Sequence, residues 1–339
     1  MEPSCVVMQD ISSAWLQLHG LQDWVGLLDP LDPTLRVEIL KYGRFSEATY
    51  DAYDPSCGSS CRYRCASLLK EVGLRDSGYE VTRYLYATMA ELPRPPWPLS
   101  LLPKGSWLQR LLRLDSWSED SNWMGFVAVS GDEETRRLGR REIVVAWRGT
   151  VEPSEWFKDA QLGMEPLKGG GVSGANVEQG FQSVYTSHGR FTTLSASEQV
   201  KTEIRRLVDT YGKEDSWKEG ISLTLTGHSL GGALALLSAH DAAASIPGLS
   251  HVSVISFGAP QVGDAAFMEE LSKKGVKVLR VVVKGDEVPK LPGIIDSLYE
   301  HAGVKLDLDM DEEDLMGQLD VAACHSLKTY LRLVESTKS

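Results

Sequence analysis

A short apolar run followed by a long run of small residues marks the middle of the chain. Residues 221–226 (ISLTLT) are apolar or β-branched, a pattern typical of a buried strand. Residues 230–244 are rich in Ala and Leu, which predicts a helix packed on a sheet. Downstream we expect strands at 251–257 and 277–283, with a helix at 264–274 between them. Strands that alternate with helices predict an α/β fold, with a mainly parallel central sheet and helices on both faces.

The same patterns extend upstream of this region. Two strands are predicted at 124–129 (MGFVAV) and 142–147 (EIVVAW), and we expect the charged stretch 131–141 to join them as an exposed hairpin loop. Residues 195–198 (SASE) form a capping box, in which Ser and Glu satisfy each other's backbone N–H groups at a helix start. A helix should therefore begin there and run to about residue 211.

The first third of the chain, residues 1–120, is predicted to be mostly helical and loop-like. An amphipathic helix is expected at 35–53, whereas 79–89 fits a strand or a short helix equally well. Residues 92–105 hold five prolines and predict a connection, not a regular element. No repeat or low-complexity segment divides the chain, so we expect this region to pack on a core of residues 121–339 within one structural domain.

Two segments near the C-terminus complete the pattern. Residues 307–314 (DLDMDEED) are acidic but lack the Gly and Glu positions of an EF-hand loop, so we expect a solvated loop and not a calcium site. Residues 327–334 predict a short terminal helix.

Charge and hydropathy exclude several classes of protein. The 339 residues carry a net charge of −12, which argues against nucleic acid binding and against electrostatic attraction to anionic membranes. No uninterrupted apolar run of about 18 residues occurs, so no membrane-spanning helix is expected. The first 15 residues lack a basic region followed by an apolar stretch, which disfavours secretory and organellar targeting peptides. We therefore expect a cytoplasmic protein.

The five cysteines do not form a recognisable framework. Cys57, Cys61 and Cys65 are spaced by four, but no second cluster or nearby histidine completes a metal site. We expect reduced, structural thiols and no bound metal.

The candidate chemistry lies between the central strand and helix. Residues 227–231 read GHSLG, which is G-x-S-x-G in the strand–turn–helix context of a nucleophile elbow. Such a turn lifts the serine side chain clear of the sheet, and the flanking glycines let strand and helix approach closely. A chance match of five residues is the alternative, but the strand and helix around the motif argue against it. We predict Ser229 as a catalytic nucleophile.

A serine hydroxyl needs a general base, and the base needs an orienting carboxylate. In α/β-hydrolase sheets the order along the chain is Ser, then Asp or Glu, then His. Among the histidines after Ser229, His240 lies inside the predicted helix and His251 at the far end of a strand. His325 precedes the terminal helix on a late loop, so we predict His325 as the base.

The carboxylate should follow a strand between the serine and the base. Asp286 fits because it comes directly after the apolar stretch VKVLRVVVKG, although a purely structural turn aspartate is the alternative. Glu287 is one residue off and would point differently, and Asp296 is the reserve candidate.

Stabilisation of a developing oxyanion needs two N–H donors. The N–H of Leu230 at the helix start can supply one. The second should come from an earlier strand–loop junction, and Thr150 after VVAWRG is the best candidate.

Residues 151–180 follow, with Trp156 and Phe157 early and a Gly-rich stretch at 169–171. Exposed aromatic residues beside a flexible segment suit a lid that contacts acyl chains over an apolar site. The alternative is an ordinary surface loop with two anchoring aromatic residues.

Nine stretches of the chain together resemble one known family. Five of them lie in the predicted core: 146–150 (AWRGT), 227–235 (GHSLGGALA), 256–264 (SFGAPQVGD), 285–292 (GDEVPKLP) and 324–331 (CHSLKTYL). The other four are 27–36 (LLDPLDPTLR), 50–54 (YDAYD), 84–88 (YLYAT) and 121–129 (SNWMGFVAV). With these motifs the chain resembles the class 3 lipase family, most closely its plant phospholipase A1 branch with short lids, over nearly its whole length.

The resemblance implies an α/β-hydrolase core whose triad and oxyanion hole are the residues predicted above, with a lid near 152–160. It also implies hydrolysis of the sn-1 acyl ester of glycerolipids, without a metal or other cofactor. The chain departs from the family at Glu178, where a His is common. It also lacks a recognisable transit peptide, which resembles the cytosolic subgroup.

The leading hypothesis is a serine acylhydrolase that acts on a glycerolipid at a membrane or micelle interface. A monoacylglycerol or triacylglycerol lipase and a small-ester esterase of the feruloyl type are alternatives. A lipase-like signalling scaffold without activity is disfavoured by the complete triad. The sequence does not define an oligomeric state.

Overall fold

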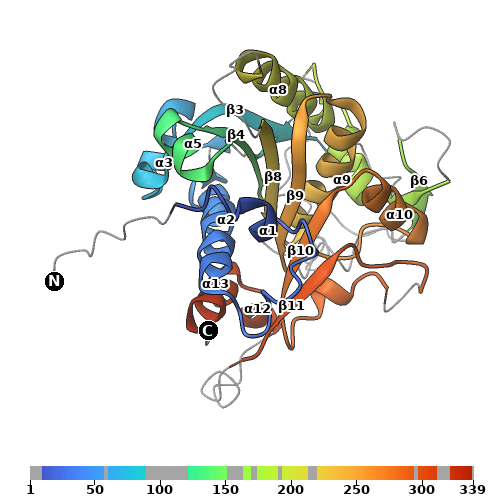
Figure 1. Cartoon of the computed structure of the whole chain (residues 1–339). Coiled ribbons are helices and arrows are strands. Elements are labelled where there is room, and N and C mark those ends of the chain that lie inside the picture. Colours follow the sequence, from blue (N-terminus) through green and yellow to red (C-terminus); the bar gives the residue numbers. More distant parts are fainter. Residues whose placement is uncertain are drawn as a thin grey trace.

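A single large sheet organises the described part of the chain (Figure 1). The computed structural model describes residues 10–56, 60–88, 121–150, 163–168, 174–189, 193–212, 220–293, 297–310 and 321–337. Within these residues the sheet has seven strands, and two small two-stranded sheets lie outside it.

The central sheet has the strand order β11-β10-β9-β8-β5-β4-β3. Along the chain its strands are β3 (Tyr79–Ala87), β4 (Asn122–Ser130), β5 (Arg141–Trp147), β8 (Ile221–His228), β9 (Leu249–Phe257), β10 (Lys277–Val283) and β11 (Val304–Leu308). The five strands from β5 to β11 are parallel, and β4 is antiparallel to both β3 and β5. The predicted mainly parallel sheet is therefore confirmed. The small sheets pair β1 (Tyr53–Asp54) with β2 (Ser60–Cys61) and β6 (Met164–Pro166) with β7 (Asn176–Glu178).

Helices cover both faces of the sheet, as predicted. The described α-helices are α1 (Trp15–Leu18), α2 (Pro33–Asp51), α3 (Leu68–Glu71), α5 (Asp132–Leu138), α7 (Gln179–Thr186), α8 (Ala196–Tyr211), α9 (Leu230–Ser245), α10 (Ala265–Lys273), α12 (Val321–Cys324) and α13 (Leu327–Ser336). Helices α2 and α13 lie side by side on one face although they are far apart in the sequence (Figure 1). Helices α7, α8, α9 and α10 pack on the other face.

Local sequence rules explain where two of the longer helices begin. Asp32 precedes α2, and its carboxylate accepts the backbone N–H groups of Thr34 and Leu35 at 2.8 and 2.9 Å. The predicted capping box opens α8, because Ser195 Oγ accepts the Glu198 N–H while Glu198 Oε2 accepts the Ser195 N–H.

The parallel register brings the carboxyl ends of four neighbouring strands, β5, β8, β9 and β10, to one edge of the sheet. Gly227 pairs with Trp147, His228 with Phe257, and Phe257 with Val281. Loops that follow parallel strands leave the sheet on the same edge, where functional groups collect in α/β proteins. The predicted nucleophile and carboxylate both follow such strands.

The expected exposed loop at 131–141 is instead a short helix, α5, followed by the start of β5. Leu138 is buried, and Glu134 pairs with Arg137 at 2.7 Å one turn later. Acidic residues in the first turn and Gly139 in a left-handed conformation after the last turn both favour a helix here. Because the segment is highly charged, we expected an exposed loop and did not recognise these two helix-capping signals.

Two other segments also bear on the predictions: the structure decides between strand and helix in one, and differs from the expected loop in the other. Residues 79–89, left open above, form the strand β3 over Tyr79–Ala87. The first residues of the acidic stretch belong to β11, in which Leu306 and Leu308 are buried while Lys305 and Asp307 point to solvent. That alternation has the period of a strand. Residues 92–105 and 311–314 lie outside the described residues.

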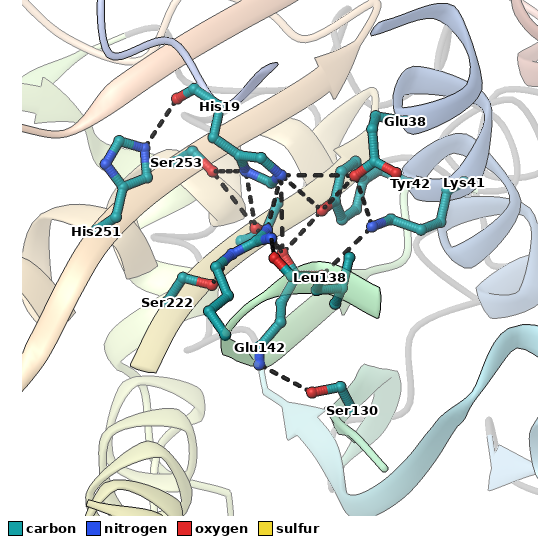
Figure 2. Close-up of polar contacts among 12 residues, drawn as sticks. His19, Glu38, Lys41, Tyr42, Ser130, Leu138, Glu142, Ser222, His251 and Ser253 are labelled. Carbon is teal, nitrogen blue, oxygen red and sulfur yellow. Dashed lines mark hydrogen bonds and ion pairs between the residues drawn. The ribbon is translucent and has the colours of Figure 1, made fainter. Parts of the chain in front are cut away.

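Charged side chains are buried between α2 and the sheet (Figure 2). Lys41 Nζ lies 2.7 Å from Glu38 Oε2 and 3.4 Å from Glu142 Oε2, and Arg140 Nη2 lies 2.9 Å from Glu142 Oε1. Burial alone would raise the pKa of Glu142, but the two cations hold it well below its usual value. Two cations and two carboxylates thus balance each other inside the protein.

Neutral groups complete this network. Tyr42 and Thr224 donate hydroxyl protons to Glu142 Oε1 at 2.8 and 2.7 Å, and Tyr79 donates to Glu142 Oε2. His19 Nε2 accepts from Arg140 Nη2 at 2.9 Å. Burial, together with the positive charge of Arg140, lowers the pKa of His19 to about 4, so this imidazole is neutral near pH 7.

The network joins the first third of the chain to the core. His19, Glu38 and Tyr42 come from α2 and the segment before it, whereas Arg140 and Glu142 come from the core. Buried polar groups are costly unless they are all partnered, so neither side can leave without exposing unpaired charge. We propose that residues 1–120 and 121–339 form one structural domain.

Replacing Glu142 by Gln should lower the free energy of unfolding by about 3–5 kcal/mol, because it leaves Lys41 and Arg140 buried without one of their carboxylates. The measurement is urea unfolding followed by circular dichroism. Glu269→Gln is the matched control, because Glu269 pairs with Lys273 on the exposed surface of α10. This substitution should lower the free energy of unfolding by less than about 1 kcal/mol. Equal losses in the two variants would contradict the assigned role of the network.

Stability should also depend on pH through His19. The folded pKa of His19 lies below its unfolded value, so below about pH 6.5 the unfolded chain binds a proton that the folded chain does not. His19 should therefore contribute a loss on the order of 3 kcal/mol of unfolding free energy as pH falls from about 6.5 to about 4. Urea unfolding across that range should show a weaker pH dependence in His19→Gln than in the wild type. Parallel curves would contradict the prediction.

Candidate active site

Ser229 occupies a strained turn between β8 and α9. Its φ of 58° and ψ of −128° place a non-glycine residue in the left-handed half of conformational space. Its N–H donates to the Phe257 carbonyl at 2.9 Å, which fixes the turn to the end of the neighbouring strand. A Cβ on Gly227 would lie 2.3 Å from the Gly231 backbone, and a Cβ on Gly231 would lie 2.4 Å from the Trp147 carbonyl oxygen. Both glycines of the motif are therefore required by close backbone approach.

A buried imidazole–carboxylate pair lies at the same edge of the sheet. His325 Nδ1 is 2.7 Å from Asp286 Oδ2, and both side chains are buried. Asp286 Oδ1 accepts the Val288 N–H at 2.9 Å, and Asp286 Oδ2 also accepts the Tyr330 hydroxyl at 2.6 Å. The carboxylate is thus held from both sides, and its hydrogen bond fixes the ring orientation of His325.

Two polar atoms at this site are buried without a hydrogen-bond partner. They are Ser229 Oγ and His325 Nε2. Catalytic hydrogen bonds are often long or poorly aligned before substrate binds, and they tighten in the reacting complex. These are the two atoms between which a proton would pass if Ser229 were the nucleophile and His325 the base.

Gly258, the residue directly after β9, makes room for the pair. A Cβ at this position would lie 2.9 Å from the Tyr330 hydroxyl oxygen and 3.1 Å from both Asp286 Oδ2 and His325 Cε1. Any side chain here would push these groups apart. The motif 256–264 quoted above contains this glycine, but its spacing alone does not reveal the contact.

The two predicted oxyanion donors belong to segments that adjoin Ser229. Leu230 is the first residue of α9, so its N–H is at the positive end of the helix. Thr150 follows β5, and a Cβ on the preceding Gly149 would lie 3.2 Å from Ser229 Cβ. The segment that carries Thr150 therefore passes directly beside the serine.

Arg148 holds this segment in place. Its guanidinium donates to the carbonyls of Gly149 and Trp123, each at 3.1 Å, and stacks over the ring of Tyr53 at 3.8 Å. Burial lowers the pKa of Arg148. Because the loop carbonyl is anchored, the N–H groups that follow it have a fixed direction.

The structure also places the rejected candidates. His240 is buried inside α9, and His251 Nε2 contacts the His19 carbonyl at 2.8 Å in the network at the far end of the sheet. Glu287 pairs with Lys290 on the surface at 2.7 Å. None of the three approaches the pair formed by His325 and Asp286. Trp156, Phe157 and Asp296 lie outside the described residues.

Sequence reasoning missed Tyr330 and gave no role to His228, whose ring lies 4.6 Å from that of His325. Both are present in the quoted motifs 227–235 and 324–331, which is the only signal that could have drawn attention to them.

Glu178 lies apart from the triad at the start of α7. Its Oε2 accepts the Phe181 N–H at 2.6 Å and so caps the helix. Burial raises the pKa of Glu178 to about 7. The departure from the family at this position thus affects a helix cap.

Within the described residues, no cluster of three or more His, Cys, Asp or Glu side chains has a geometry suited to a metal ion. In the same residues, none of the helices combines the length and the apolar character needed to cross a membrane.

Comparison with known proteins agrees with this geometry. A deletion mutant of the Rhizomucor miehei lipase propeptide complex superposes with a TM-score of 0.53 at 20% identity, over 82% of this chain and 68% of that chain. The fold is therefore the α/β-hydrolase fold of lipases, as predicted.

Sequence comparison defines the family. The model described as Lipase (class 3) matches residues 144–295. Phospholipase A1-Igamma1, chloroplastic, from Arabidopsis thaliana is 40% identical, over 96% of this chain and 68% of that protein. Phospholipase A1-II 7 from Oryza sativa subsp. indica is 38% identical, over 97% of this chain and 84% of that protein. The chain belongs to the class 3 lipase family, in its plant phospholipase A1 branch, and is a carboxylic ester hydrolase.

The expected cytoplasmic location is wrong. Several relatives, Phospholipase A1-Igamma1 among them, are named as chloroplastic or chloroplastic/mitochondrial proteins. The expectation depended on the first 15 residues alone. Targeting is decided by a short segment that the folded core neither contains nor requires, so the fold gives no information about compartment.

Replacing Asp286 by Asn should lower kcat by about 10⁴-fold, because the amide no longer fixes the tautomer of His325. Hydrolysis of p-nitrophenyl butyrate measures the effect. Glu287→Gln changes the adjacent, surface-exposed carboxylate and should leave kcat within about twofold. A larger loss in Glu287→Gln than in Asp286→Asn would refute the choice of Asp286.

Proposed function

We propose that this protein is a phospholipase A1 that hydrolyses the sn-1 acyl ester of glycerophospholipids, with Ser229, His325 and Asp286 as its catalytic triad. The observation that carries the proposal is the buried His325–Asp286 pair at 2.7 Å beside the strained Ser229 turn. It occurs in a chain 40% identical to a protein named phospholipase A1. Fold alone would not specify the substrate, because one fold serves many functions.

In the first half of the reaction, Ser229 Oγ attacks the ester carbonyl carbon while His325 Nε2 takes the hydroxyl proton. The carbonyl oxygen becomes an oxyanion that accepts hydrogen bonds from the N–H groups of Leu230 and Thr150. The C–O bond to glycerol then breaks, and the proton on His325 goes to the departing glycerol oxygen. The lysophospholipid leaves, and the acyl group stays on Ser229 as an ester.

In the second half, water attacks the acyl-enzyme carbonyl. His325 removes a proton from the water and returns it to Ser229 Oγ as the acyl bond breaks, so a free fatty acid is released and the enzyme is restored. Asp286 accepts the hydrogen bond from His325 Nδ1 and stabilises the His325 cation that forms in each half. Loss of a single oxyanion donor typically costs about 2.7–4 kcal/mol in such transition states.

The substrate would be taken from a membrane or micelle interface. The three side chains of the triad are almost fully buried, with at most 4% of each residue exposed. A water-poor site strengthens the ion pair and the oxyanion contacts during reaction. Burial also means that an acyl chain must reach Ser229 by displacing protein groups, which an aggregated lipid surface can favour.

The deciding experiment uses phosphatidylcholine that carries different acyl chains at sn-1 and sn-2. The wild type should release the sn-1 fatty acid, and Ser229→Ala should release none while its circular dichroism spectrum is unchanged. Ser245→Ala is the matched control, because Ser245 is the last residue of the same helix and is exposed.

The identity of the released product separates the alternatives. Release of the sn-2 chain would contradict the positional proposal. Turnover of monoacylglycerol or of a short soluble ester, without turnover of phospholipid, would replace it with a lipase or small-ester esterase. Wild-type activity in Ser229→Ala would exclude Ser229 as the nucleophile.

A further inference from the structure

A chain of hydrogen bonds runs from α2 to the backbone of the proposed base. Tyr50, in the last turn of α2, has its hydroxyl 2.7 Å from His228 Nδ1. The other ring nitrogen, His228 Nε2, lies 2.7 Å from the carbonyl oxygen of His325. His228 immediately precedes Ser229, so the chain passes beside the nucleophile on its way to the base.

The chemistry of the partners fixes the direction of each bond. A carbonyl oxygen can only accept, so His228 Nε2 carries the proton that it donates to His325. Burial, together with the nearby His325, holds the pKa of His228 well below its usual value, so His228 carries only one ring proton. His228 Nδ1 is therefore an acceptor, and Tyr50 donates its hydroxyl proton to it.

Tyr50 also reaches the oxyanion segment. The Gly149 N–H donates to the Tyr50 oxygen, and burial raises the pKa of Tyr50, so the phenol keeps the proton that it donates. A Cβ on Gly149 would lie 2.2 Å from this oxygen and 2.5 Å from the His228 carbonyl oxygen. One hydroxyl thus accepts from the segment before Thr150 and donates toward the segment that carries His325.

His325 needs such an anchor because it lies in a short turn between α12 and α13. In this turn the Ala323 carbonyl accepts the Ser326 N–H at 3.2 Å and the Thr329 hydroxyl at 2.8 Å, and neither bond involves His325 itself. The His228 ring lies against the His325 ring in a tilted arrangement, with centroids 4.6 Å apart and an interplanar angle of 36°, and it supplies the donor to the His325 carbonyl. Asp286 fixes the far side of the imidazole, whereas His228 fixes its backbone and one face.

We propose that Tyr50 and His228 are positioning residues that hold the general base and the oxyanion segment in register with the nucleophile. The proposal rests on the roles assigned above to Ser229, Asp286 and His325. In this proposal, neither residue contacts the reacting atoms. Their contribution is geometric, since small displacements of reacting groups reduce rates strongly.

Tyr50→Phe removes the shared hydroxyl and keeps the ring. It should lower kcat for p-nitrophenyl butyrate on the order of ten- to a hundredfold, while KM stays within about twofold. Tyr42→Phe is the matched control, because it removes a buried hydroxyl from the same helix about 12 Å away along its axis. Tyr42→Phe should lower the Tm and leave kcat within about twofold.

Variants of His228 test the donor itself. The side-chain amide in His228→Gln can still donate to the His325 carbonyl, so this variant should retain most of kcat. His228→Leu cannot donate a hydrogen bond, so its kcat should be at least as low as that of Tyr50→Phe. In the double variant Tyr50→Phe with His228→Leu, the loss should be smaller than the product of the two single losses, because both substitutions break one chain.

Three results would overturn the proposal. They are a kcat within twofold of the wild type for Tyr50→Phe, an equal loss of kcat in Tyr42→Phe and Tyr50→Phe, and fully multiplicative losses in the double variant. The short soluble ester keeps this test independent of the phospholipid assignment. An enzyme that cleaves p-nitrophenyl butyrate but not phosphatidylcholine would lose its proposed substrate and still report on Tyr50 and His228.

Discussion

The strained backbone of Ser229 is the constraint on which the site depends. A non-glycine residue in this conformation costs about 1–3 kcal/mol, and it persists only where its surroundings leave no alternative. Here the surroundings are the Phe257 carbonyl, which accepts the Ser229 N–H, and the glycines at 227 and 231, which let α9 close onto β5 and β8. Parallel pairing of β8 with β9 supplies the carbonyl in the right place. The backbone geometry of Ser229 therefore depends on the register between β8 and β9.

The two ends of the sheet differ in how their buried polar groups are partnered. At the end that holds His19, Glu38, Lys41, Arg140 and Glu142, buried charges are paired and hydroxyls fill the remaining acceptors. At the other end, Ser229 Oγ and His325 Nε2 are buried without partners. Unsatisfied buried groups are costly, so a reactive edge of this kind needs stability from elsewhere in the molecule. The balanced network is positioned to provide it, through the same helix α2 that carries Tyr50.

Much of the fold followed from the sequence because its signals are local. Apolar runs marked β8, β9 and β10, the capping box marked α8, and chain order placed Asp286 and His325 after Ser229. Local signals gave the wrong prediction in α5 and at the end of β11, where highly charged segments were expected to be loops. They could not reveal Tyr330, Tyr50 or the partners of Glu142, because those contacts join residues that are distant in sequence and meet only when the sheet is assembled. The cytoplasmic expectation failed for a different reason, since compartment is not a property of the fold.

Helix α13 has a consequence for the order in which the molecule becomes active. It carries Tyr330, which bonds Asp286, it begins two residues after His325, and it packs against α2. During synthesis on the ribosome the serine turn, the sheet and the carboxylate all emerge before this helix. With His325 as the proposed base, a partly synthesised chain, or one cut by a protease ahead of residue 325, would hold a nearly complete sheet and still be unable to attack the lipids of the cell that makes it.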